Sequence, residues 1–383
     1  MMVKGFVFFR DGKIPFVIEN YRMELFTDDS LLNDFCKEYN LKENYILHGQ
    51  CFTIGIRGSK ATFLVENSMG STCYLRCYVV NMFDKDEEYD YIGFQSPSLD
   101  RVFRYEYEYL DRVRSGINLA VEPKVAYRVP FDMSGRKYEL EFRIGHNNRL
   151  GLLEDLDRRG EVMLSPHTNE IQECYEITNV LQRLAMFMTS SAEVPFKRII
   201  LYKSGLKVAR FYCPLICEDI GVEYGGSFHE FDVMKYIPKI INNIALDSGN
   251  KITQSVPLGH LGSFDSMFTP QRFLEQVVAF EYLFDKLDHK KAQNRQFPLK
   301  EELKYMFNEF PQLLSRNKLS AEDISDQIKK TRHTIAHGSA YYYDFKNDSH
   351  TKYLMILLDK LIKCMSLKWM GFSCVEIANL VLF

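Results

Sequence analysis

The chain has 383 residues, 46% of them hydrophobic and 26% charged, which is the composition of an ordinary globular protein. This length is too great for one simple core, so two or three domains are expected. The net charge of -3 excludes a polycationic protein, although residues 266–383 hold 17 Lys and Arg against 14 Asp and Glu. A mildly basic C-terminal part is compatible with a polyanionic partner.

We expect a cytoplasmic protein that does not contact a membrane. The apolar run Phe6–Phe9 near the N-terminus is too short for a signal peptide. No stretch reaches the ~18 uninterrupted apolar residues of a spanning helix. The nine cysteines, an odd number in a long chain, favour a reducing compartment.

The cysteines predict neither a disulfide framework nor a metal site. Cys73 and Cys77 lie about 13 Å apart in an expected strand, which is too far for one metal ion. Cys213 and Cys217 are a better-spaced pair, but no second pair accompanies them. Buried structural thiols are the favoured interpretation, and we expect no metal and no cofactor.

The first part of the chain is predicted to be rich in β-strands. Runs of β-branched and aromatic residues bounded by turn signals predict strands at Phe6–Phe9, Ile14–Ile18, Tyr45–Ile56, Lys60–Glu66, Thr72–Asn81, Lys124–Val129, Lys137–Ile144, Arg198–Tyr202 and Val208–Tyr212. Asp84–Tyr91 is expected to be an acidic loop. Helices are expected at Leu99–Arg112, Glu170–Met188 and 228–246, the last with a kink or boundary at Pro238.

Beyond a loose stretch at 247–262 the pattern becomes entirely helical. Apolar residues at three- and four-residue intervals predict helices at Pro270–Lys290, Leu299–Leu314, Ser320–His337 and Asp348–Met370, and a short one that reaches Phe383. We therefore predict an α+β fold. Its β-rich N-terminal domain spans 1–262, with a subdomain break near 150–165 if there are two subdomains, and its helical bundle spans 266–383.

Six residues near the end of the chain, Arg332-His-Thr-Ile-Ala-His337, carry the most specific chemical signal, and Gly338 follows them directly. They join a permanent cation to imidazoles, which exchange protons near neutral pH. This combination suits the cleavage of a phosphodiester without a metal ion.

The helix that carries these residues has a predicted core face. At about 100° per residue, one narrow arc collects Ile324, Ile328, Thr331 and Ile335. Relative to Ile328, Arg332 lies at about 40°, at the margin of the core. His333 lies at about 140° and His337 at about 180°, so both point away from the bundle.

Two other interpretations of these residues stay open. An arginine and a histidine at a helix end can simply bond the last carbonyls. His333 and His337 also have the spacing of two zinc ligands on one helix face. The zinc interpretation lacks the intervening Glu of the hydrolase pattern and a third ligand nearby, so the arginine–histidine interpretation is favoured.

The C-terminal part resembles the HEPN family, in which an arginine precedes a histidine by a few residues near the end of a bundle helix. The segments Phe273–Glu281 and Ile328–Gly338 are similar to the opening helix and the active-site helix of the ApeA-like subgroup. In the N-terminal part, Tyr45–Thr53 and Ile92–Asp100 resemble the β-rich domain that precedes HEPN in ApeA-like proteins.

The resemblance implies a metal-independent endoribonuclease of bacterial anti-phage defence, acting by abortive infection as a homodimer whose two motifs meet. Arg332 would hold the phosphate and His337 would act as general acid or base. His333 would be a supporting proton donor, and Glu281 could fix Arg332 from a neighbouring helix. Two alternatives are a non-catalytic module for RNA binding or dimerisation, and the toxin of a toxin–antitoxin pair. Neither the RNA target nor a phage-derived trigger or antitoxin is identified by the sequence.

Overall fold

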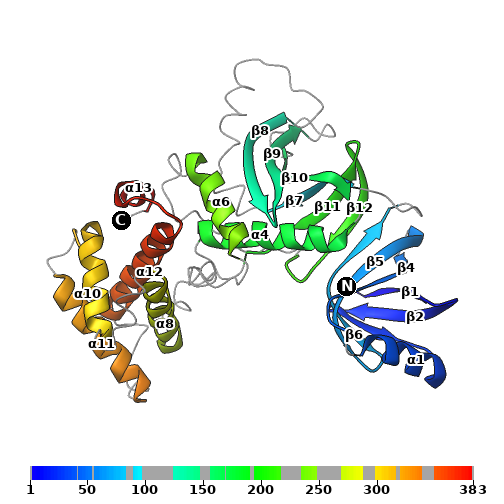
Figure 1. Cartoon of the computed structure of the whole chain (residues 1–383), viewed down its shortest axis with the longest axis horizontal. Coiled ribbons are helices and arrows are strands. Elements are labelled where there is room, and N and C mark those ends of the chain that lie inside the picture. The colour runs from blue at the N-terminus through cyan, green and yellow to red at the C-terminus, as the bar shows by residue number, and fades with distance from the viewer. Residues whose placement is uncertain are drawn as a thin grey trace. The chain divides into compact units, whose positions relative to one another are not determined.

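The computed structural model describes residues 2–381 except 41, 54–55, 83–88, 97–123, 147–155, 169, 190–193, 217–233, 248–268, 288–297, 316–319 and 339–348. Within these residues the chain has a β-rich N-terminal region and a helical C-terminal region (Figure 1). The predicted α+β class is therefore confirmed.

The N-terminal strands form a closed antiparallel barrel. Its elements are β1 (Val3–Phe9), β2 (Gly12–Glu19), β3 (Arg22–Leu25), α1 (Asp29–Tyr39), β4 (Tyr45–Thr53), β5 (Ile56–Met69) and β6 (Thr72–Asn81). The strands neighbour one another in the order β3-β2-β1-β4-β5-β6, and β3 also pairs with β6. This last pairing closes the ring, so the two edge strands of the sheet protect each other.

The interior of the barrel is filled by alternate residues of its strands, as the two-residue period of a half-buried strand requires. Val7, Phe16, Leu47 and Phe63 are among its fully buried side chains. Helix α1 packs on the same core through Phe35, whose ring lies 5.3 Å from that of Phe9. The aromatic residues of this region thus serve mainly as core.

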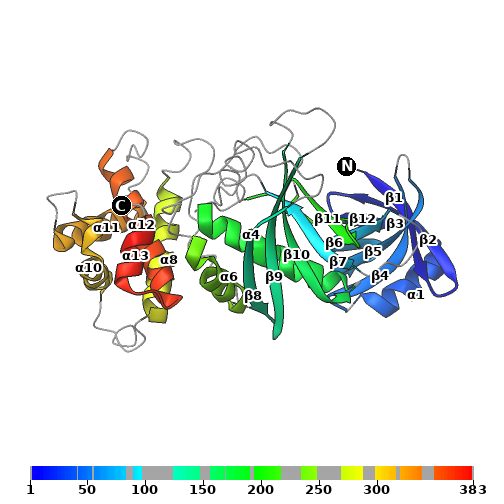
Figure 2. The ribbon, with the colours of Figure 1, turned by 90° about the horizontal axis from the view of Figure 1, so that it is seen from above.

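The sheet continues beyond the barrel through the C-terminal half of β6. The further strands are β7 (Tyr89–Gln95), β8 (Lys124–Met133), β9 (Arg136–His146), β10 (Leu156–Thr168), β11 (Arg198–Lys203) and β12 (Leu206–Tyr212). They follow β6 in the order β12-β11-β7-β10-β9-β8. Helix α4 (Ile171–Thr189) lies against these strands (Figures 1 and 2), where Tyr138 donates to the buried Glu173 at 2.8 Å.

Four elements of this region were not predicted, and two predictions need correction. The sequence patterns missed α1, β3, β7 and β10. Asp84–Tyr91 is not entirely a loop, because Tyr89–Tyr91 belong to β7, which pairs with β10 and β11 in the interior of the sheet. The predicted strand Tyr45–Ile56 is too long, because β4 ends at Thr53, which pairs with Ile56 of β5. The predicted helix Leu99–Arg112 lies outside the described residues.

Each predicted helix of the C-terminal region is present with narrower bounds, and residues 228–233 and 288–290 of two of them lie outside the described residues. The elements are a 3₁₀ turn (Met234–Tyr236), α6 (Ile237–Leu246), α8 (Pro270–Leu287), α10 (Leu299–Glu309), a 3₁₀ turn (Pro311–Leu313), α11 (Ala321–Ala336), α12 (Ser349–Trp369) and α13 (Cys374–Leu380). Pro238 stands in the first turn of α6, where a missing backbone N–H costs least. The predicted helix Leu299–Leu314 is interrupted, because α10 ends at Glu309 and Pro311 starts a 3₁₀ turn.

Helix α12 packs against α8 in the bundle core. Its middle is buried on nearly every side, from Leu357 to Leu367 apart from Asp359 and Lys360. Gln276 of α8 is buried as well and donates to the backbone oxygen of Met355 at 3.1 Å. This contact satisfies one polar group inside the bundle.

The chain divides into two compact units. One comprises Met1–Asp100, Tyr105–Gln182 and Pro195–Gly221, and the other comprises Arg101–Arg104, Arg183–Val194 and Val222–Phe383. The division thus falls within α4. The predicted domain boundary at 262–266 lies outside the described residues, as does the start of the 150–165 segment, of which β10 occupies 156–165.

Candidate functional site

Helix α11 has a defined start and a defined end. Ser320 and Asp323 form a complete capping box, in which the Ser320 hydroxyl accepts from the Asp323 backbone at 3.1 Å. At the other end His337 is the C-cap, and its backbone N–H donates to the His333 oxygen at 3.1 Å. Gly338 has a φ of +79°, a conformation that favours glycine, and ends the helix.

The predicted core face of α11 is confirmed. Ile324, Ile328, Thr331 and Ile335 are buried. Arg332, by contrast, is exposed rather than marginal, because its long side chain leaves the edge of the core for water. Within the part of the chain that the structure describes, its guanidinium makes no ion pair, so it is available to an anion.

The two histidines lie together on the exposed side of the last turn. Both His333 and His337 are exposed, and their ring centroids are 4.1 Å apart with the planes tilted by 56°. One permanent cation and two adjacent imidazoles thus occupy six consecutive residues. Such a group can bind a phosphate and both accept and donate a proton beside it.

Charge is divided along the exposed side of α11. Its first half carries Glu322, Asp323 and Asp326, and no carboxylate stands between Gln327 and Gly338. The second half carries the exposed Lys329 and Lys330 in addition to the motif.

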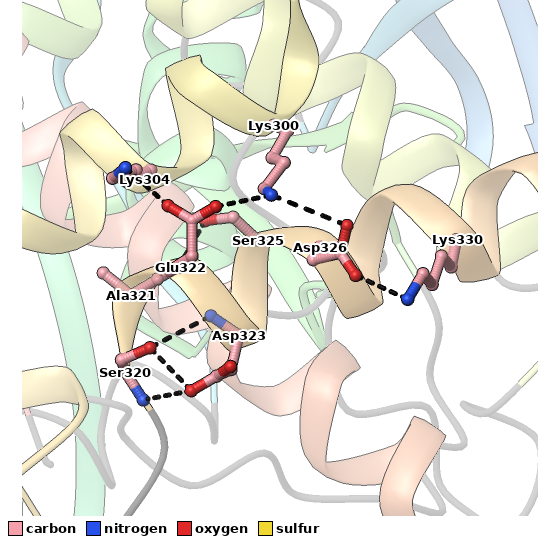
Figure 3. Close-up of polar contacts among 9 residues, drawn as sticks. All are labelled: Lys300, Lys304, Ser320, Ala321, Glu322, Asp323, Ser325, Asp326 and Lys330. Carbon is pink, nitrogen blue, oxygen red and sulfur yellow. Dashed lines mark hydrogen bonds and ion pairs between the residues drawn. The ribbon is translucent and has the colours of Figure 1, made fainter.

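Ion pairs neutralise Glu322 and Asp326 of the acidic half (Figure 3), whereas Asp323 bonds to Ser320 in the capping box. Glu322 lies 2.5 Å from both Lys300 and Lys304 of α10, and these lysines hold the pKa of its carboxyl below the usual value. Asp326 pairs with Lys330 at 2.6 Å, which lowers the pKa of Asp326. The pair also uses the charge of Lys330, so Lys329 and Arg332 are the cations of the basic half that make no ion pair within the described residues.

Glu281 does not join this group in the described residues. No hydrogen bond or ion pair connects it with Arg332. Glu281 instead acts electrostatically on Glu302 of α10, together with Asp285. Burial and these two carboxylates raise the pKa of Glu302 to about 7.

This acidic contact predicts a pH-dependent stability. The folded chain keeps the Glu302 proton up to about pH 7, whereas the unfolded carboxyl loses it near 4.5. Stability is therefore lost as the pH rises through this window, because the folded state binds more protons. At about pH 8, Glu302→Gln should raise the free energy of unfolding by ~1 kcal/mol, a value already reduced for solvent screening. This gain corresponds to an increase of roughly 2–4 °C in the unfolding temperature. Scanning calorimetry at about pH 5 should show little difference. An equal gain from Glu301→Gln would contradict this assignment.

The described residues contain no group of three or more His, Cys, Asp and Glu side chains that could hold a metal ion. His333 and His337 thus lack a third ligand there. Six of the eight described cysteines are buried free thiols, namely Cys51, Cys73, Cys77, Cys174, Cys213 and Cys364. Cys217 lies outside the described residues.

Comparison with known proteins identifies the bundle. Residues 268–376 match the family model described as Apea-like HEPN. Residues 268–376 therefore form an ApeA-like HEPN domain. The match contains α8, α10, α11 and most of α12 and α13, so the motif of α11 lies within the HEPN domain. Neither a curated protein nor a solved structure matches the chain.

An HEPN domain indicates a ribonuclease-type or nucleotide-related function in a defence context. None of the helices in the described ranges is long and apolar enough to cross a membrane.

Sequence reasoning missed two features of the HEPN domain. Lys329 and Lys330 extend the basic end of α11, and the absence of carboxylates after Asp326 could have signalled this. Lys363 is 3% exposed in α12, and burial lowers its pKa to about 8. Its position among apolar neighbours in sequence gives little sign of burial, because helical lysines usually face water.

Proposed function

We propose that this protein is a metal-independent endoribonuclease that acts in the cytoplasm in bacterial anti-phage defence, by abortive infection. The observation that supports the proposal best is the grouping of Arg332, His333 and His337 on the exposed end of one helix in an HEPN domain. RNA is the proposed substrate because its 2′-hydroxyl can attack the adjacent phosphate, which DNA cannot do.

The proposed reaction is an internal transesterification. One imidazole removes the proton of the 2′-hydroxyl, and the 2′-oxygen then forms a bond to phosphorus. The bond from phosphorus to the 5′-oxygen breaks, and a protonated imidazole supplies the proton that this leaving group needs. His337 takes one of these roles, and His333 is close enough to take the other. Arg332 binds the phosphate and stabilises its developing charge.

A second copy of the chain is the proposed partner of the site. Arg332, His333 and His337 are exposed in the single chain, so they do not by themselves exclude water from a bound phosphate. A homodimer that brings two α11 ends together would enclose the substrate and double its cationic charge. Sedimentation of the purified chain should therefore give twice the monomer mass.

The proposal is tested with the full chain and total cellular RNA in excess chelator, with the cut ends mapped. We expect cleavage to 2′,3′-cyclic phosphate and 5′-hydroxyl ends. Activity that requires added magnesium or zinc would contradict the mechanism.

The exposed lysines of α11 support the first of two alternative functions. Lys329, Lys330 and Arg332 would also serve a non-catalytic module that binds RNA or dimerises. Retention of RNA on the intact chain without any cleavage would favour that module. Dependence of cleavage on the removal of a cognate inhibitor would favour a toxin of a toxin–antitoxin pair.

A further inference from the structure

The outer surface of two barrel strands carries aromatic and basic side chains that the core does not use. We call this surface the barrel face and define it as the outward residues of β1 and β4: Lys4, Phe6, Phe8, Ile46, His48, Gln50 and Phe52. Their outward direction is set by the alternating inward residues, which are buried. Phe8 is 39% exposed, Ile46 42% and Phe52 45%.

The strand register gathers these side chains into one band. Lys4 of β1 is paired with Phe52 of β4, and Phe6 is paired with Gln50. The rings of Phe6 and Phe52 meet edge to face with centroids 5.3 Å apart. On the other side of β1 (Figure 1), Lys13 of β2 is paired with Phe8, and its ammonium lies 5.7 Å from the ring.

The barrel face carries positive charge although residues 1–265 as a whole have a negative net charge. Residues 1–265 hold 31 Lys and Arg against 37 Asp and Glu. None of the seven outward residues of β1 and β4 is a carboxylate, and the exposed Lys4 and Lys13 stand among them or beside them. A surface that is aromatic and cationic within an acidic region is complementary to an anion with flat apolar groups.

Packing does not account for these rings. Burial of a phenylalanine stabilises a fold, but Phe8 and Phe52 leave much of their surface in water. Single exposed apolar residues are common, whereas a contiguous patch rimmed by polar groups marks an interaction site. Proteins that bind single-stranded nucleic acid combine these two elements, with aromatic rings for the bases and cations for the phosphates.

We propose that the barrel face binds single-stranded RNA, with bases stacked on Phe8 and Phe52 and phosphates held by Lys4 and Lys13. The choice of RNA over DNA rests on the proposed function of the HEPN domain. RNA binding by the barrel face does not require that the HEPN domain cleaves RNA. This binding would give the N-terminal region a role in RNA capture.

Binding is tested in the full chain with His337→Ala, so that the probe is not cut. The probe is a fluorescent oligouridine of about 15 nucleotides, followed by anisotropy. Phe8→Ala together with Phe52→Ala should weaken binding at least about tenfold, because stacking contributes to each base. Lys4→Ala with Lys13→Ala should lower the slope of log affinity against log salt by about 1.4.

Met69→Ala with Leu206→Ala is the matched control. Both side chains are 69% exposed in the same compact unit and lie off the barrel face, so binding should not change. If the phenylalanine variant fails to fold by circular dichroism, the lysine variant carries the test. Unchanged binding in the folded barrel-face variants would overturn the inference.

Three further results would be decisive. Loss of self-association with unchanged RNA affinity would show that the barrel face binds a second copy instead, and would overturn the inference. Tighter binding of the matching DNA strand would overturn the assignment to RNA. If the wild-type chain cuts no RNA but oligouridine binding depends on the barrel face, the proposed nuclease function fails and this inference stands.

Discussion

His337→Ala is expected to reduce RNA cleavage by about 10²–10⁴-fold, the usual contribution of a general acid or base. Arg332→Ala should have an effect of similar size, because it removes the cation that stabilises charge on the phosphate. Both side chains are exposed, and neither belongs to the buried face of α11. The free energy of unfolding of each variant should therefore stay within about 0.5 kcal/mol of the wild-type value.

Single-turnover cleavage of a defined RNA in chelator measures this prediction. Lys329→Ala is the matched control, since Lys329 is exposed on the same helix and carries one positive charge. It should weaken binding while the rate at saturating RNA stays within about threefold, since phosphate contacts position the strand. Arg332→Lys should restore only part of the activity, because lysine keeps the charge but loses the forked donors. Full activity in both alanine variants would exclude the motif as the catalytic site.

The sequence predicts α11 closely because its signals are local. Ser320 and Asp323 define its start, Gly338 defines its end, and the spacing of Ile324 and Ile328 defines its buried face. The outward direction of His333 and His337 follows from the same geometry and is confirmed by their exposure. Features that depend only on residues within one helix could thus be predicted from the sequence.

Contacts between different helices could not be predicted in the same way. Glu281 was expected near Arg332, but its electrostatic neighbour is Glu302 of α10. The side of α8 that meets α10 depends on how the helices pack, and the spacing within α8 carries no information on it. The same limit hid Lys363, whose burial depends on the helices around α12.

The sequence patterns also did not predict two strands of the sheet, one of which closes the barrel. Strand β3 has only the four residues Arg22–Leu25, which is too short for a periodicity signal. In strand β10 three charged residues, Asp157, Arg158 and Arg159, follow Leu156 and conceal the strand pattern. Both strands are fixed by their neighbours, since β3 is held between β2 and β6 and β10 between β7 and β9.

Gly49→Ala is expected to destabilise the barrel by about 3 kcal/mol or more, because overpacking between backbones cannot be relieved by a rotamer change. Gly49 of β4 is paired with Val7 of β1, and a Cβ at Gly49 would overlap the carbonyl group of Phe6. Gly5 has the same relation to the carbonyl of Gln50 across the same pair of strands. The two glycines thus permit the close approach of β1 and β4, and the barrel face lies on the outer side of these strands.

Hydrogen exchange of the β1 and β4 peptides measures this effect directly, since loss of the strand pair exposes their amides. Gly12→Ala is the matched control, because the nearest atom to its added Cβ would be 3.6 Å away, an ordinary contact. The single tryptophan, Trp369, ends α12 in the other compact unit, so its fluorescence reports separately on the HEPN domain. Equal protection of β1 and β4 in the Gly49→Ala and Gly12→Ala chains would show that the two strands accommodate an added Cβ without losing their pairing. In that case the close approach of β1 and β4 would not be what fixes the barrel face.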